Sequence, residues 1–348
     1  MTKVAFSADY HFGKKNNSEY HNKKLLEFIQ MKIDYCIENH IEHMIICGDY
    51  FDNRQKIDVK TLHYGIQGMK MLHDQSVADV SVVIGNHDLY HRDRLDIAST
   101  DVIEPYCDLI KEETIKNIDD YKVQLVPWIC DGEHWDRVVK QSKDAEYCFG
   151  HFEFNGFRMN SHYVMEHGQS YKELKHLNRV ITGHFHHRQL IDNVIYVGSP
   201  FPFDFGDSDD NQRGFGVIDL ETNEVEFIDC NLSAIMTVDY KDLLEGKYDQ
   251  QLSDDNTDIR VTFSEEVDND VLVEVQSKLE QSSVRQSKIE YKPKKIKDYI
   301  EGDVEIEEIE DIDQMVLKYL EKSNEVEGYN KELLTEQYKE AMRYNDSI

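Results

Sequence analysis

The 348-residue sequence has few basic residues, no long apolar run, no paired cysteines and no glycine-rich phosphate loop. Its 39 Lys and Arg against 69 Asp and Glu give a formal charge of −30, which excludes binding of nucleic acid through a globally basic surface. No apolar segment approaches the ~20 residues of a membrane-spanning helix, and the first residues do not resemble a signal peptide. The six cysteines are scattered without a CxxC pair, as in reduced core thiols. We therefore expect a cytoplasmic protein with no membrane partner.

Short apolar segments alternate with helical patterns over residues 1–230, and a hydrophobic content of 40% excludes a disordered acidic protein. Val4–Ala8, Met44–Cys47 and Val80–Ile84 predict strands that are buried on both faces. Apolar residues at helical spacing predict helices within Leu25–Ile37 and Val59–Leu72. Further strands are expected at Val123–Trp128, Tyr147–Gly150, Val180–Gly183, Val194–Gly198, Gly214–Leu220 and Val225–Cys230, and helices near Glu133–Gln141 and Tyr171–Leu177. This pattern favours a two-sheet α/β sandwich.

The composition changes after residue 230 and predicts three further parts. Residues 231–297 combine strand-like Ile259–Phe263 and Lys288–Tyr291 with helix-like Val271–Leu279, which indicates a small α/β domain. It ends in a basic strip made of Arg285, Lys288, Lys292, Lys294, Lys295 and Lys297. Residues 298–314 form an acidic linker, and residues 315–348 carry two short amphipathic helices that cannot bury their apolar faces alone. We expect this helical tail to dock on a partner.

Polar motifs follow five of the predicted strands. They are Asp9-x-His11, Gly48-Asp49-x-x-Asp52, Gly85-Asn86-His87-Asp88, Gly150-His151 and Gly183-His184-x-His186. Loops at the carboxyl ends of strands converge in α/β sheets, so these side chains should meet. A lone Asp-x-His or Gly-Asp is more often a surface turn than a ligand, whereas three polar side chains in a row, as in Gly-Asn-His-Asp, have no structural use at the end of a buried strand. All five motifs in this order at strand ends are not plausibly chance. The set offers carboxylate, imidazole and carboxamide without thiolate, which suits Mn²⁺, Fe²⁺ or Zn²⁺.

The order of these motifs resembles the calcineurin-like metallophosphoesterase superfamily over residues 9–186. The resemblance implies that Asp9, His11, Asp49 and His186 hold one divalent ion, and that Asp49, Asn86, His151 and His184 hold another. His87 would stay free of metal beside the scissile phosphate, with Asp88 orienting it. Two such ions, Mn²⁺ foremost and Mg²⁺ a further alternative, can activate a water and neutralise an in-line phosphoryl transition state.

Further segments look like one branch of that superfamily, the SbcCD-type DNA repair nucleases and most closely their bacteriophage recombination endonuclease subunits. They are Val126–Cys130, Gly150–Phe157 and Arg213–Phe215. The resemblance implies a DNA exo/endonuclease, homodimeric through its nuclease domain (1–230), with a DNA-capping domain (231–297) and a tail that binds an SbcC-like coiled-coil ATPase in the host cytoplasm. The basic strip Arg285–Lys297 would then contact DNA; alternatively, it pairs with the acidic run Glu301–Asp313.

Alternatives remain open at two points. Asp52 lies where cellular members of the family often have a histidine. It can contact and orient a metal-ligating side chain, or it can cap the Val59–Leu72 helix. The same motifs also fit a phosphatase or cyclic-nucleotide phosphodiesterase with a regulatory tail, since they fix the reaction class and not the substrate. A non-enzymatic DNA-end scaffold is disfavoured because every motif position is intact.

Overall fold

The computed structural model describes residues 2–291, apart from residues 77, 160–162, 209, 211 and 266. The predicted acidic linker, the predicted helical tail and the lysines of the basic strip from Lys292 onward lie outside the described residues. None of the described helices is long and apolar enough to span a membrane.

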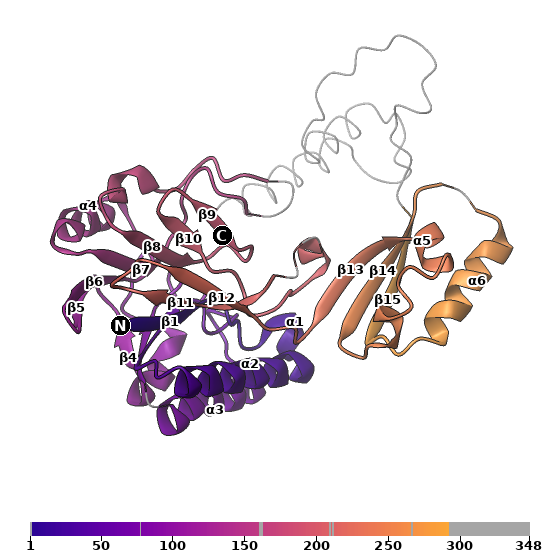
Figure 1. Ribbon diagram of the computed structural model, residues 1–348, viewed down its shortest axis with the longest axis horizontal. Helices are drawn as coiled ribbons and strands as arrows, with labels where there is room; N and C mark the ends of the chain where they lie inside the picture. The colour runs from indigo at the N-terminus through magenta and orange to yellow at the C-terminus, as the bar shows by residue number, and fades with distance from the viewer. Residues whose placement is uncertain are drawn as a thin grey trace, which may run out of the picture. The chain divides into compact units, whose positions relative to one another are not determined.

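The first sheet has six strands in the order β12-β11-β1-β2-β3-β4 (Figure 1). Its strands are β1 (Lys3–Ser7), β2 (His43–Cys47), β3 (Asp79–Val83), β4 (Asp108–Ile110), β11 (Gly214–Asp219) and β12 (Val225–Asp229). Strands β1 to β4 run parallel, with Ala5 opposite Met44, whereas β11 and β12 are antiparallel to their neighbours. The parallel strands therefore all deliver their carboxyl ends to one edge of the sheet.

The second sheet also has six strands, in the order β5-β6-β7-β8-β10-β9. They are β5 (Thr114–Ile118), β6 (Tyr121–Val126), β7 (Tyr147–His151), β8 (Arg179–Gly183), β9 (Gln189–Ile191) and β10 (Val194–Tyr196). The four inner strands are parallel, and β5 and β9 are antiparallel edges. The sequence predicts only the inner strands, because only these are continuous runs of buried apolar residues. The edge strands β5 and β9 lack such a run and are not predicted.

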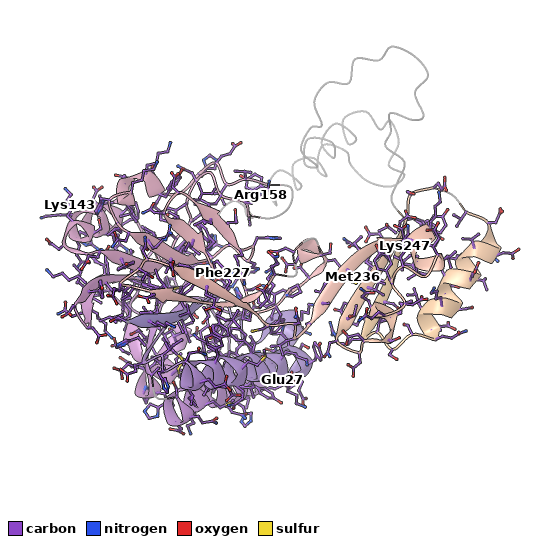
Figure 2. All side chains as sticks on the ribbon, in the orientation of Figure 1. Glu27, Lys143, Arg158, Phe227, Met236 and Lys247 are labelled. Atoms are coloured by element: carbon purple, nitrogen blue, oxygen red, sulfur yellow. The ribbon has the colours of Figure 1, made fainter. Side chains whose placement is uncertain are left out.

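Apolar side chains fill the space between the two sheets. Phe6 and Ile45 of the first sheet are buried in one cluster with Phe149 and Ile181 of the second. Phe227 of β12, labelled in Figure 2, packs against the same cluster at its margin. The predicted two-sheet α/β sandwich is therefore confirmed.

Helices cover the outer faces of both sheets. The first sheet is covered by α2 (Glu19–Glu38) and α3 (Val59–Gln75), which lie side by side (Figure 1), and the second by α4 (Gly132–Gln141). Ser18 and Asp58 cap α2 and α3 by accepting hydrogen bonds from backbone N–H groups of the first turn. The expected helix Tyr171–Leu177 is instead a 3₁₀ turn, Tyr171–Leu174.

A third, three-stranded parallel sheet follows the sandwich in the sequence. It contains β13 (Ala234–Asp239), β14 (Thr257–Phe263) and β15 (Gln286–Tyr291), with α5 (Tyr240–Leu244) and α6 (Asn269–Glu280). Its own buried cluster includes Leu243, Val261 and Val275. The remaining short elements are α1 (Lys14–Asn17) and 3₁₀ turns at Ser99–Tyr106, Ser142–Asp144, Phe205–Asp207 and Gln251–Ser253.

A fully buried lysine lies between α2 and the first sheet. The Lys32 ammonium donates to the Ser7 hydroxyl at 2.8 Å, and Ser7 lies 2.9 Å from the Tyr10 hydroxyl. Within the described residues, no carboxylate forms an ion pair with it. Burial lowers the pKa of Lys32 from 10.5 to about 8. Because the folded-state pKa lies below the unfolded value, the charged amine destabilises the fold at neutral pH, and this penalty disappears as the pH rises from 8 towards 10.5.

We expect Lys32→Met to stabilise the protein at pH 7 by up to about 3 kcal/mol, because methionine carries no buried charge. The difference in unfolding free energy between variant and wild type should shrink as the pH approaches 10. Urea denaturation at several pH values measures it. Lys23→Met, at an exposed position of α2, should change stability little at any pH. A less stable Lys32→Met protein would mean that the hydrogen bond to Ser7 outweighs the buried charge.

Candidate metal centre

The loops that follow β1 and β2 are joined by backbone hydrogen bonds. The N–H groups of Asp9 and His11 donate to the carbonyls of Gly48 and Asp49, both at 3.0 Å. Asp9, His11 and Asp49 all have left-handed backbone conformations, with φ between 51° and 56°. Such conformations are unfavourable for non-glycine residues, so the surrounding structure must hold them. Gly48 has a φ of +89°, and a side chain there would collide with the ring of His151.

One group of donor atoms forms around His11. Its Nε2 lies 3.1 Å from His186 Nε2 and 3.6 Å from Asp49 Oδ2. Asp9, His11 and His186 offer ligand atoms that all lie within 4.8 Å of one another. The Asp9 carboxylate also accepts the backbone N–H of His184 at 3.0 Å, which fixes its position. We call Asp9, His11, Asp49 and His186 the first donor group.

A second group forms around His151, on the other side of Asp49. His151 Nδ1 lies 2.7 Å from the carbonyl oxygen of Cys47, so this nitrogen carries the proton and donates. In the neutral ring the lone pair is on Nε2, which lies 2.9 Å from the Asn86 side-chain oxygen and 3.5 Å from Asp49 Oδ2. The neutral ring therefore directs its lone pair towards two oxygen atoms.

His184 repeats this arrangement. Its Nε2 lies 3.2 Å from the Glu153 carboxylate and donates to it, so Nδ1 keeps a lone pair. That Nδ1 lies 3.0 Å from the same Asn86 oxygen. Asp49, Asn86, His151 and His184 form the second donor group. With both imidazole rings neutral, these side chains direct lone pairs at a common point. Oxygen and nitrogen lone pairs converge in this way where a cation belongs, and the donor set fits a borderline-hard divalent ion.

The pKa values of the buried side chains in the two groups show that negative charge is concentrated there. Burial, and then the nearby Asp49, raise the pKa of Asp9 to about 7. Asp49 is fully buried, which would raise its pKa, but the imidazoles of His151 and His11 hold it well below the usual range. Despite burial, the nearby Asp49 and Asp9 raise the pKa of His151 to about 9, so without metal Nε2 of His151 also holds a proton, which a bound cation would replace. Asp49 is thus the carboxylate that both groups share.

His87 lies beside the two groups, and one of its ring nitrogens is engaged in a hydrogen bond. Its Nδ1 donates to the backbone carbonyl of Asp52 at 2.7 Å, and its ring centre lies 4.8 Å from that of His11. Its backbone N–H donates to Asp49 at 2.8 Å. The Nε2 atom of His87 is left available for a proton transfer.

Asp88 has partners that differ from the expected contact with the His87 ring. Its buried carboxylate accepts the backbone N–H groups of Phe51 at 3.0 Å and Gly85 at 2.9 Å. It therefore ties the loop after β3 to the loop after β2, and positions His87 through the backbone.

Asp52 acts on His11 and does not cap a helix. Its carboxylate lies 3.2 Å from His11 Nδ1 and 3.3 Å from the Lys14 ammonium. The cap of α3 is Asp58, whose side chain accepts from Lys60 N–H. Of the two readings open from the sequence, the contact with His11 is the one observed.

Two viral proteins are similar to this chain in sequence. Exonuclease subunit 1 of Enterobacteria phage T4 is 31% identical over 283 residues, 80% of this chain and 81% of that protein. The chain belongs to this family of metallophosphoesterase-type phage nuclease subunits. A putative phosphoesterase, 078R, of Invertebrate iridescent virus 3 is 25% identical over 66% of this chain and 65% of its own length.

Two further comparisons concern protein-family models and solved structures. No protein-family model matches the chain. A dimetal phosphatase structure from Danio rerio (LOC 393393) aligns with a TM-score of 0.41 and 11% identity, over 62% of this chain and 91% of its own. Family membership confirms the resemblance found in the sequence and makes the chain a metal-dependent phosphoesterase of the nuclease type. The clustered His and Asp side chains offer ligand atoms for a divalent metal.

Glu153 is a residue of this family member that sequence reasoning missed. It lies two residues beyond His151, and the only sequence signal was an acid close to a motif histidine. Its hydrogen bond to His184 lowers the pKa of Glu153, although partial burial opposes this, so it is charged at neutral pH. It fixes the proton of His184 on Nε2 and so directs Nδ1 towards Asn86.

We expect Glu153→Gln to weaken divalent-metal binding by about 10- to 100-fold, since neutral Gln no longer fixes the orientation and basicity of His184. Calorimetric titration of the metal-free protein with Mn²⁺ measures this. Glu38→Gln, at the exposed end of α2, is the matched control. Unchanged affinity in Glu153→Gln would show that His184 keeps its orientation without the carboxylate.

Only two residues of the basic strip lie in the described part, and both are paired. Arg285 forms an ion pair with the buried Asp258 and lies over the Tyr20 ring, 4.2 Å from its centre. Lys288 lies 3.4 Å from Glu290. Asp258 comes from the neighbouring strand β14, whereas Glu290 lies two residues beyond Lys288 on β15 itself.

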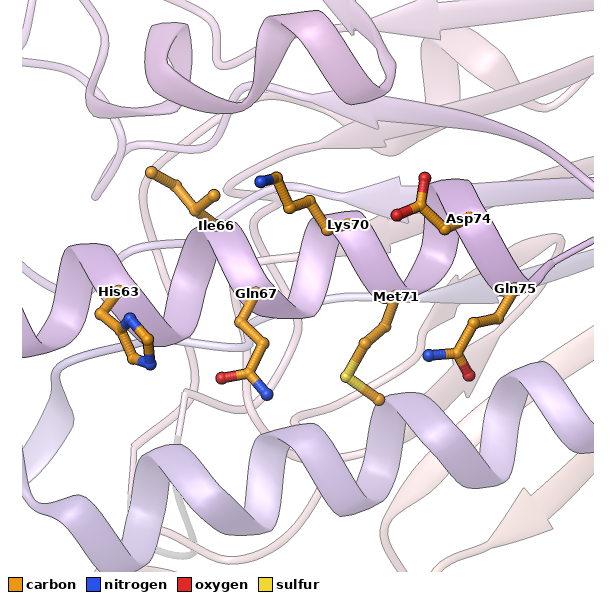
Figure 3. Close-up of a pocket in the computed structure, with 7 residues that line it drawn as sticks. All are labelled: His63, Ile66, Gln67, Lys70, Met71, Asp74 and Gln75. Atoms are coloured by element: carbon orange, nitrogen blue, oxygen red, sulfur yellow. The ribbon is translucent and has the colours of Figure 1, made fainter.

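The cavity in Figure 3 is separate from the metal centre. It has a volume of 330 Å³ and lies along α3, lined by side chains of that helix such as His63, Lys70 and Asp74. It contains none of the predicted site residues, and its wall of single-helix side chains offers no cluster of metal-ligating atoms among the described residues.

Proposed function

We propose that this chain is the DNA-cleaving subunit of a recombination and double-strand-break repair complex, and that it hydrolyses phosphodiester bonds at a two-metal site loaded with Mn²⁺. The observation that carries the proposal is Asp49, whose Oδ2 lies 3.6 Å from His11 Nε2 in the first donor group and 3.5 Å from His151 Nε2 in the second. A carboxylate between two such groups can bridge two ions.

The two donor groups supply the ligands. The first metal would be held by Asp9, His11, Asp49 and His186, and the second by Asp49, Asn86, His151 and His184. When bound, a pair of divalent ions lowers the pKa of a water and neutralises charge on a phosphoryl oxygen. Cys47 contributes only its backbone carbonyl, and burial raises the pKa of its thiol, so no thiolate favours a softer ion.

His87 would protonate or stabilise the leaving oxygen. Its Nδ1–H is held by the Asp52 carbonyl, which fixes the ring, and Asp88 holds the loop that carries it. These contacts support a positioned acid whose free nitrogen faces the substrate.

The remaining partners rest on the family. Since the phage T4 relative is called a subunit of an exonuclease, we propose DNA as the substrate, an SbcC-like ATPase as the partner and a homodimer through the nuclease domain. The described cysteines are all free, which suits the reducing cytoplasm of a host cell.

Cleavage assays on three substrates test the proposal. Plasmid or hairpin DNA, bis-p-nitrophenyl phosphate and a phosphomonoester are each incubated with the protein in EDTA and after addition of Mn²⁺, Mg²⁺ or Zn²⁺. We expect DNA and the small diester to be cut, best with Mn²⁺, and the monoester to survive. Hydrolysis of the monoester, or of the small diester alone, without DNA cleavage would instead support the alternative, a phosphatase or cyclic-nucleotide phosphodiesterase.

A further inference from the structure

A small cavity adjoins the second donor group, since Asn86 and His184 line it. It has a volume of 330 Å³ and is lined by Asn86 and His184 of that group, together with Arg54, Arg92 and Trp128. A cavity of this size is at the lower end of the range for small-molecule sites. It can take one nucleotide but not a duplex.

Two arginines in this wall have no carboxylate partner among the described residues. Arg54 is half-buried, and its Nη1 is buried without a hydrogen-bond partner. Burial and then the charge of Arg92 lower the pKa of Arg54, so the two guanidinium groups repel each other. By contrast Arg94, two residues further along the same loop, pairs with Asp96 at 3.1 Å. Two unpaired arginines side by side in a protein of charge −30 indicate a place for an anion.

One carboxylate, Glu153, also lies in the cavity wall and accepts a hydrogen bond from His184 Nε2 at 3.2 Å. Its single negative charge opposes the two guanidinium groups, Arg54 and Arg92, which leave these three side chains with a net positive charge. The neighbouring polar groups are the Asn86 and His184 side chains, which face the metal position.

Trp128 gives the cavity an aromatic wall. Its backbone N–H donates to the Ile84 carbonyl at 2.9 Å, and the indole packs against the cluster of Ile84, Leu89 and Ala98. The ring lies 5.1 Å from that of His184, between centres. A half-buried, anchored indole beside two guanidinium groups can stack a base while a phosphate is held.

We propose that this cavity is a nucleotide subsite, which holds the nucleotide next to the scissile bond with its phosphate on Arg54 and Arg92 and its base on Trp128. The inference rests on the proposed function, because it names the part of the substrate that this wall of the metal centre receives. Arg54, Arg92 and Trp128 would then determine the position of a DNA end relative to the metal centre.

Binding of 5′-dAMP to the full-length, Mn²⁺-loaded protein tests the subsite without any cleavage. We expect dAMP to quench Trp128 fluorescence, and Arg54→Gln and Arg92→Gln each to weaken binding by about 10-fold or more. Arg94→Gln removes the same charge from the same loop and should bind dAMP as the wild type does. Deoxyadenosine, which lacks the phosphate, should bind poorly to all of them. Trp128→Phe should abolish most of the quenching, since the second tryptophan, Trp135, lies in α4 and bonds to Glu173.

The outcomes separate this proposal from the proposed function. Equal dAMP affinity in wild type, Arg54→Gln and Arg92→Gln would overturn the subsite, because the metals alone would then hold the phosphate, whether or not DNA is cleaved. Arginine-dependent dAMP binding by a protein that cuts no DNA would support the subsite and contradict the proposed function. If Arg54→Gln does not fold, the exposed pair Arg92→Gln and Arg94→Gln decides the question.

Discussion

Asp49→Asn should abolish metal-dependent cleavage, with a loss of roughly 10³-fold or more, the equivalent of several kcal/mol of transition-state stabilisation. Asparagine keeps the shape of the side chain but removes the negative charge that faces both His11 and His151. Because these imidazoles hold the pKa of Asp49 well below its usual range, the wild-type carboxylate is ionised at any working pH. Cleavage rate and bound Mn²⁺, the latter measured by mass spectrometry, should fall together.

The control for this variant is Asp136→Asn, which makes the same chemical change on the exposed face of α4. It should keep full activity and metal content, and thermal unfolding checks that both proteins fold. An Asp49→Asn protein that still cuts DNA at the wild-type rate would contradict the assignment of this carboxylate as a bridge.

His87→Ala should separate metal binding from chemistry. We expect cleavage to fall by roughly 10²- to 10⁴-fold, the usual effect of removing a positioned acid or base. Metal content and DNA affinity should stay near wild type, because Nδ1 of His87 is used by the Asp52 carbonyl and the two donor groups are complete without it. Single-turnover cleavage with excess enzyme, alongside metal analysis and DNA-binding titration, measures the three quantities.

His63→Ala, on the exposed face of α3, is the matched control for His87. If His87→Ala loses one metal equivalent, His87 is a ligand. The third cluster of possible ligands, His11 with Asp52 and His87, would then be the one that holds an ion.

The sandwich could be predicted because buried parallel strands leave a plain signal, a short run of apolar residues followed by a polar motif. The same signal locates the donor residues, since those motifs follow β1, β2, β3, β7 and β8, whose carboxyl ends converge. The position of each polar motif after a predicted strand is therefore enough to identify most of the candidate ligand residues.

Contacts made by side-chain direction could not be predicted in this way. Glu153 matters because its carboxylate meets a histidine 31 residues further along the chain, and Asp88 matters because it reaches the backbone of Phe51. Arg54 and Arg92 lie on loops after different strands, and nothing in their spacing indicates that they share one cavity. Such pairings depend on packing between elements, which local periodicity does not encode.

The joined, left-handed loops after β1 and β2 have a consequence for substitutions in this centre. The hydrogen bonds between the loops run from backbone N–H groups of Asp9 and His11 to backbone carbonyls of Gly48 and Asp49. A substitution that changes only the side chain of Asp9, His11 or Asp49 leaves every atom of these bonds in place. Such variants should therefore lose ligand atoms while the two loops stay tied to each other.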